Sequence, residues 1–184
     1  MRARRSSAGA GGARIPRNTQ GRDRRAAFAA VAALHYGAAV SKSAGGAWRL
    51  RCDGGSRGNP GPGACAFVLA DPAGHEVEAR GDYLGSVTNN VAEYRALIAG
   101  LEAAARHAVR ELEVNMDSEL VVRQMTGEYR VKNEGLKPLH QLAQAARRAI
   151  PDVRFVAVRR EFNVRADQLV NETLDRILGS ESPR

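Results

Sequence analysis

The chain has 184 residues, of which 43% are hydrophobic and 26% are charged, a composition typical of a globular domain with a buried core. This composition excludes collagen and a chain that is disordered throughout, and no apolar run is long enough to predict a membrane-spanning helix. The two cysteines, Cys52 and Cys65, are too few for a disulfide framework, so we expect buried thiols and a cytoplasmic protein.

The net charge of +8 is confined to residues 1–47. That segment contains nine Lys and Arg against one acid, whereas residues 48–184 contain nineteen of each sign. It is rich in Arg, Ala and Gly and poor in large apolar residues, so we expect a disordered basic extension. Three uses stay open for it: an arm that binds polyanions, an organelle-import peptide, or an extension without a role.

From Trp48 onward, periodic segments alternate with turn signals, which predicts a folded domain over residues 48–178 and a short tail over 179–184. Three strands are expected first, with a Gly/Pro loop over 54–63 between the first and the second. Short strands joined by tight turns indicate an antiparallel meander. The expected strands cover residues 49–52, 64–70 and 75–83.

The second half alternates helices with strands. A helical period begins at Asn90 and continues to about His107. The later elements are a strand over 112–116, helices over 118–126 and 136–150, a strand over 153–159 and a helix over 164–178. Such alternation indicates parallel strands joined by crossovers. The predicted fold class is α/β, with a mixed five-stranded sheet, three antiparallel strands and then parallel ones, flanked by helices.

Four acidic residues stand at the ends of these elements. Asp53 and Asp117 each follow a strand, and Glu93 and Asp167 are expected in the first turns of two helices. In an α/β sheet the carboxyl ends of parallel strands and the helix N-termini meet at one edge, where ligands bind. Carboxylates gathered there repel one another unless a cation neutralises them, and oxygen ligands select hard ions such as Mg²⁺.

Each acid also has a purely structural explanation. Asn90 and Glu93 form a capping-box pattern, and Asp117 is placed to cap the short helix that follows it. Asp167 lies near the favourable end of a helix dipole, and Asp53 can stabilise a glycine turn. A shared site is favoured because two of the acids follow apolar strands that are expected to end at the same sheet edge.

The segments that carry these acids resemble, in order and spacing, the four motifs of type 1 ribonuclease H: residues 53–61 (DGGSRGNPG), 88–93 (TNNVAE), 116–121 (MDSELV) and 163–167 (NVRAD). The resemblance covers about residues 48–178. It implies a ribonuclease H-like fold and hydrolysis of the RNA strand of RNA/DNA hybrids, with 5′-phosphate and 3′-hydroxyl products. The catalytic acids it implies, which bind two Mg²⁺ ions or Mn²⁺ as a substitute, are Asp53, Glu93, Asp117 and Asp167.

The same resemblance implies which residues contact the substrate. Those of the glycine-rich loop would read the RNA sugar, because only the 2′-hydroxyl distinguishes RNA from DNA at a given site. Those of the second motif would contact a DNA phosphate and sugar or base edges. The implied substrate-binding residues are Gly54, Gly55, Ser56, Asn59, Thr88, Asn89 and Asn90. We expect a monomer that binds RNA/DNA hybrids and no membrane.

The chain departs from the family pattern in two places. Residues 127–136 leave no room for the basic helical protrusion with which some bacterial members grip the hybrid. The histidine that assists turnover in the loop before Asp167 is missing, and Arg159, Arg160 and Glu161 stand in its place. The basic extension and Tyr129 are candidates for the missing grip on the substrate.

Two other functions stay open. The first is a catalytically weak module of the same fold that binds hybrids or double-stranded RNA; it predicts the loss of at least one acid, and all four are present. The second is an integrase- or transposase-type reaction, which usually needs further DNA-binding domains. The sequence also leaves open whether double-stranded RNA is cut.

Overall fold

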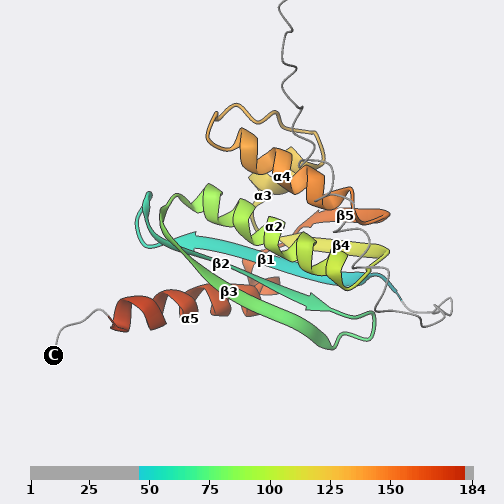
Figure 1. Cartoon of the computed structure of the whole chain (residues 1–184), viewed down its shortest axis with the longest axis horizontal. Helices are drawn as coiled ribbons and strands as arrows, with labels where there is room; N and C mark the ends of the chain where they lie inside the picture. Colours follow the sequence, from blue (N-terminus) through green and yellow to red (C-terminus); the bar gives the residue numbers. More distant parts are fainter. Residues whose placement is uncertain (1–45, 181–184) are drawn as a thin grey trace, which may run out of the picture. The chain divides into compact units, whose positions relative to one another are not determined.

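The computed structural model describes residues 46–180, whose centre is a five-stranded sheet in the order β3-β2-β1-β4-β5 (Figure 1). The first three strands pair antiparallel, and β4 and β5 continue the sheet in parallel on the other side of β1. The strands are β1 (Trp48–Ser56), β2 (Gly61–Ala70), β3 (Glu76–Val87), β4 (Glu111–Met116) and β5 (Asp152–Ala157). The predicted mixed α/β sheet is confirmed.

Helices cover both faces of the sheet. Helices α2, α3 and α4 lie on one face and α5 lies on the other (Figure 1). Their bounds are α2 (Asn89–Arg106), α3 (Glu119–Met125), α4 (Lys137–Arg147) and α5 (Val164–Ser180), with a single 3₁₀ turn, η1 (Arg160–Phe162), before α5. Within residues 46–180, none of these helices is long and apolar enough to cross a membrane.

The alternation of side chains along β2 explains the two layers. Phe67 and Leu69 enter the large core under α2, whereas Ala64 and Ala66 face α5 together with Val170. Successive residues of a strand point to opposite faces, so one strand serves both cores. The small alanines allow α5 to pack close to the sheet, which places the N-terminal end of α5 beside the ends of β1 and β4.

The predicted loop over 54–63 is wrong in its extent. Strand β1 continues to Ser56 and β2 begins at Gly61, so only residues 57–60 remain in the turn. Gly54 and Gly55 pair with residues of β2. A strand ladder uses the backbone N–H and C=O groups, which glycine supplies as well as any residue, so a glycine-rich sequence is compatible with pairing when a partner strand is present.

The last helix is longer than predicted. Helix α5 continues through Ser180, so the first two residues of the predicted tail belong to the helix. Residues 181–184, and residues 1–45 of the predicted basic extension, lie outside the described residues. Between α3 and α4, residues 126–136 contain turns and no helix, which agrees with the expected lack of a helical protrusion.

Candidate active site

Two of the predicted acids meet through the parallel pairing of β1 with β4. Cys52 pairs with Met116 in this register, so the residues that follow them, Asp53 and Asp117, lie side by side at the same edge of the sheet. Strand β4 ends at Met116, and Asp117 is the first residue beyond it. Asp53 remains inside β1 because that strand still pairs with β2, and it is only 6% exposed.

Glu93 reaches this pair because Gly54 has no side chain. A Cβ atom on Gly54 would lie 2.2 Å from the carbonyl carbon of Ala92 and 2.3 Å from the backbone nitrogen of Glu93. Only glycine therefore allows α2 to lie this close to β1. As a result, one carboxylate oxygen from each of Asp53, Glu93 and Asp117 lies within 4.8 Å of the others. We call these residues the acid triad.

Burial and crowding make the ionised acid triad unfavourable in the absence of a cation. Burial, followed by the charges of Asp117 and Asp167, raises the pKa of Asp53 to about 6. Burial, followed by the charges of Asp53 and Asp117, raises the pKa of Glu93 well above its usual value. The Oε2 atom of Glu93 is buried and has no hydrogen-bond partner among the described residues. This donor set fits a hard divalent cation.

Asp167 lies close to the acid triad but outside it. It stands in the first turn of α5, as predicted, and its charge contributes to the raised pKa of Asp53. Its Oδ1 is paired with the guanidinium of Arg160, and its Oδ2 accepts a hydrogen bond from Asn171 at 3.3 Å. The structure therefore brings three of the four predicted acids into one set and gives the fourth a cationic partner.

Two residues at the site were not assigned a role there from the sequence. Asn163 is fully buried, and its side-chain nitrogen donates to Asp117 Oδ1 at 2.9 Å. The charge of Arg160 opposes the rise in pKa of both Asp53 and Glu93. The available signal was that both lie in or just before the last motif, but no local pattern indicates that an amide is buried against a carboxylate.

Three of the predicted substrate-binding residues, Ser56, Asn59 and Asn89, form a connected group where the β1–β2 turn meets the start of α2. The backbone N–H and the hydroxyl of Ser56 both donate to Asn89 Oδ1 at 2.8 Å. The N–H of Asn89 donates to Asn59 Oδ1 at 3.3 Å. Gly55 is half-buried beside this group, whereas Gly54 is buried and has the packing role described above.

The capping interpretations of two acids are wrong. Thr88 is the N-cap residue of α2, without a side-chain cap bond, so Glu93 lies in the second turn rather than the first. The carboxylate of Glu93 belongs to the acid triad and makes no capping hydrogen bond to Asn90, which is exposed. Ser118, not Asp117, is the N-cap residue of α3. The structural alternatives for these acids therefore lose their main support.

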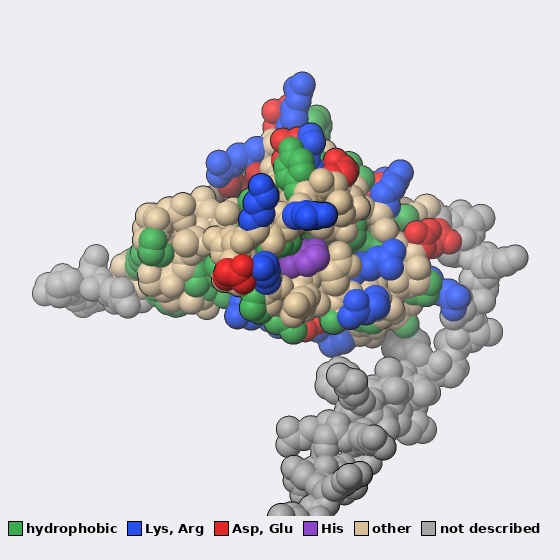
Figure 2. All heavy atoms as spheres, turned by 90° about the horizontal axis from the view of Figure 1, so that it is seen from above, with side chains coloured by type: hydrophobic (Ala, Val, Ile, Leu, Met, Phe, Trp, Pro, Cys, Tyr) green, Lys and Arg blue, Asp and Glu red, His purple; other side chains and the backbone are tan. Residues whose placement is uncertain are grey.

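Tyr129 borders a cavity of about 460 Å³ between α3, α4 and the segment that joins them. The cavity is lined by polar and basic side chains, among them Arg130, Lys137 and His140. The guanidinium carbon of Arg123 lies 5.1 Å from the centre of the Tyr129 ring. Lys and Arg side chains are spread over the helical face that carries α4 (Figure 2). An aromatic ring among cations is a suitable contact for a nucleic-acid strand.

Comparisons with known proteins agree with this geometry. Residues 51–173 match the protein family described as "Reverse transcriptase-like". Ribonuclease HI of Halobacterium salinarum is 42% identical over 138 residues, which cover 75% of this chain and 69% of that protein. The crystal structure of ribonuclease H1 from the same archaeon has a TM-score of 0.69, at 42% identity, and the match covers 71% of this chain and 99% of that one.

A second solved relative was determined with a nucleic acid. The structure of LC11-RNase H1, a protein isolated from compost, in complex with an RNA/DNA hybrid has a TM-score of 0.68 at 43% identity. The match covers 71% of this chain and 99% of that one. The family match over residues 51–173 includes all four acidic motifs, and with these relatives it shows that the chain belongs to the ribonuclease HI family of ribonuclease H enzymes.

Proposed function

We propose that this protein is an endonuclease that hydrolyses the RNA strand of RNA/DNA hybrids. The acid triad carries the proposal, because three crowded carboxylates, one with a buried unpartnered oxygen, need divalent cations to be stable in their ionised form. The hybrid present in the solved LC11-RNase H1 complex supports the same substrate here. The proposed products carry 5′-phosphate and 3′-hydroxyl ends.

We further propose that the four acids would hold two Mg²⁺ ions. Asp53, Glu93 and Asp117 would supply the ligands from the acid triad, and Asp167 would supply a further carboxylate beside it. Divalent cations held in this way supply positive charge to the phosphodiester and make a bound water more acidic. The chain itself contributes the burial of Asp53, which keeps bulk water from competing for its carboxylate, and the Arg160 guanidinium, which balances the charge of Asp167.

Selection of RNA is assigned to the group formed by Ser56, Asn59 and Asn89. Their hydrogen bonds hold the glycine-rich turn against the start of α2. The exposed backbone of this turn can then approach a ribose closely, and its polar groups can bond the 2′-hydroxyl that DNA lacks. Thr88 and Asn90, which flank Asn89, are proposed to contact the DNA strand.

A cleavage assay tests the proposal. Labelled RNA/DNA hybrid, double-stranded RNA and double-stranded DNA are incubated with the full chain in Mg²⁺, in Mn²⁺ and in EDTA. The expected result is cleavage of the RNA strand of the hybrid with either metal and none in EDTA. Tight binding of the hybrid without cleavage would instead identify a binding module, and cleavage of the DNA duplex would indicate a different reaction on the same fold.

A further inference from the structure

Asn163 connects the chain segments of three acids, although it is not acidic itself. Its side-chain nitrogen donates to the carbonyl oxygen of Cys52 at 2.8 Å and to Asp117 Oδ1 at 2.9 Å. The backbone carbonyl oxygen of Asn163 accepts a hydrogen bond from the backbone N–H of Asp167 at 3.1 Å. Cys52 directly precedes Asp53. One residue thus joins the end of β4 and the start of α5 to the part of β1 that carries Asp53.

The burial of Asn163 favours an orienting role over a stabilising one. The side chain is 0% exposed, and its two contacts use both hydrogens of the amide, which fixes its rotation. Its Oδ1 is buried and has no hydrogen-bond partner among the described residues. A buried polar atom without a partner is unfavourable for folding, so this amide is poorly explained by packing alone.

We propose that Asn163 is a positioning residue for the metal-binding acids. By holding Oδ1 of Asp117, it fixes the rotamer that presents this carboxylate to Asp53 and Glu93, and so sets the affinity of the acid triad for a divalent cation. Hydrogen-bond partners of metal ligands typically control metal affinity or activity by about 10–100-fold. The inference rests on the proposed function, because it takes the acid triad to be the metal site.

The test replaces Asn163 in the full chain and measures Mn²⁺ binding without nucleic acid, by electron paramagnetic resonance and calorimetry. Asn163→Leu keeps the branched heavy-atom skeleton and removes the donor, so the Kd for Mn²⁺ should rise about tenfold or more. The Mg²⁺ concentration for half-maximal cleavage should rise in proportion, while KM for the hybrid at saturating Mg²⁺ stays within about twofold of wild type. Asn163→Ser, whose shorter side chain cannot reach both acceptors, should change Mn²⁺ binding in the same direction.

Gln124→Met is the matched control. Gln124 is also a buried amide, 6% exposed, but its Oε1 accepts a hydrogen bond from the Tyr94 hydroxyl at 2.7 Å and, among the described residues, its side chain makes no hydrogen bond to the acid triad. This variant should lower the thermal midpoint and leave Mn²⁺ binding unchanged. A folded Asn163→Leu or Asn163→Ser protein that binds Mn²⁺ within about twofold of wild type would overturn the proposal.

The two hypotheses fail in different ways. If the wild-type protein binds Mn²⁺ in a manner that depends on Asn163 but cleaves no hybrid, the positioning role stands and the proposed function fails. If it cleaves hybrids and its Mn²⁺ affinity does not respond to Asn163, the proposed function stands and the positioning role fails.

Discussion

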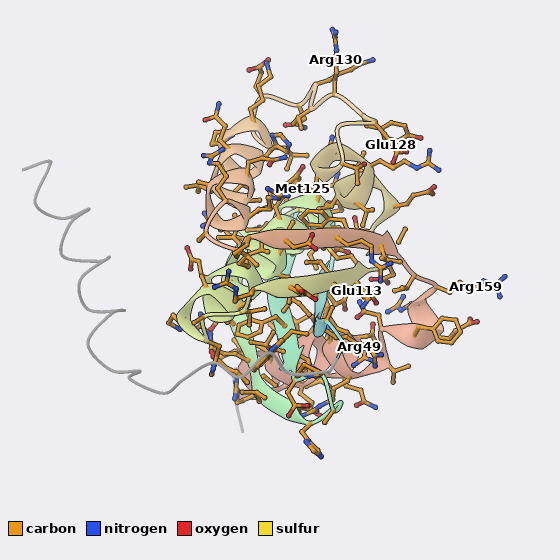
Figure 3. All side chains as sticks on the ribbon, turned by 90° about the vertical axis from the view of Figure 1, so that its right-hand side faces the viewer. Arg49, Glu113, Met125, Glu128, Arg130 and Arg159 are labelled. Carbon is orange, nitrogen blue, oxygen red and sulfur yellow. The ribbon has the colours of Figure 1, made fainter. Side chains whose placement is uncertain are left out.

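Glu113, an acid within β4, and the acid triad beyond the end of that strand have opposite surroundings. Glu113, on β4, accepts a hydrogen bond from Asn115 and pairs with the guanidinium of Arg154, and these partners hold its pKa below the usual value. The carboxylates of Asp53 and Glu93, at the end of the same sheet, have raised pKa values. Arg49 is the β1 residue that pairs with Glu113 in the register, and the two lie near each other in Figure 3.

The opposite pKa shifts distinguish an acid that stabilises the fold from acids that are arranged to bind a ligand. The chain itself supplies a cation to Glu113, the guanidinium of Arg154, so the ionised form of Glu113 stabilises the folded state. The acid triad has no side-chain cation in direct contact among the described residues, and Arg160 is paired with Asp167 instead. A site that must accept an external cation cannot also be saturated by internal ones, so it is expected to reduce the stability of the metal-free protein.

The largest expected effect comes from Asp53→Asn. Cleavage of the hybrid should fall by about three orders of magnitude or more, because an amide is a poor metal ligand. In EDTA at pH 7 the same variant should be more stable than wild type, by up to about 3 kcal/mol, because it removes a carboxylate whose pKa is raised from 3.8 to about 6. Turnover and urea unfolding measure the two quantities.

Glu113→Gln is the control for that variant, since it also replaces a carboxylate by an amide, but outside the acid triad. It should leave turnover within about twofold and lower the stability by less than about 1 kcal/mol, because the Arg154 side of its ion pair is 71% exposed and solvent weakens such a pair. Near-normal turnover in Asp53→Asn would contradict the assignment of the acid triad.

The second-largest effect is expected from Gly54→Ala, which disturbs the packing of α2 against β1. The added Cβ would meet the backbone of Ala92 at 2.2 Å, so α2 must move away from β1 and Glu93 must move away from Asp53. We expect a loss of about 1–3 kcal/mol of stability together with a large loss of turnover. Gly179→Ala, at a position where nothing lies within 4 Å of the added atom, should be neutral or stabilising by up to about 1 kcal/mol. A Gly54→Ala protein with wild-type turnover would show that the approach of α2 is not required.

The third effect is the pH dependence of the metal-free protein. Because the folded-state pKa of Asp53 is raised from 3.8 to about 6, its favourable contribution is complete below pH 3.8 and is lost as the pH rises through about 6. The free energy of unfolding in EDTA should therefore decrease over this interval relative to that of Asp53→Asn. Saturating Mg²⁺ at neutral pH should restore stability, because it binds only the folded form. An identical pH profile for the two proteins would be inconsistent with a raised pKa at Asp53.

The smallest effect is expected at Tyr129, which is 47% exposed and lies in the segment that follows α3. Tyr129→Ala should raise KM for the hybrid about threefold, with kcat unchanged, because it removes one exposed stacking surface. Tyr129→Phe retains the ring and should behave like wild type. An unchanged KM in the alanine variant would remove this cavity from the substrate-binding surface.

The order of the elements and the meeting of acids at one sheet edge could be predicted, because strand and helix periods are local properties. Asp53 and Asp117 were placed correctly for that reason. The role of Gly54 as a close packing point and the burial of Asn163 could not be predicted, because each depends on a partner distant in the chain. The extension of β1 through two glycines was missed for the same cause.

The hydrogen bonds among Ser56, Asn59 and Asn89 tie the glycine-rich turn to the helix that carries Glu93. The glycine-rich turn, which would contact the ribose, therefore cannot shift without moving α2 and its Glu93. A duplex that fits the turn poorly is then expected to bind without being hydrolysed, as a competitor. Inhibition of hybrid cleavage by intact DNA duplex would show that discrimination is made after docking rather than during it.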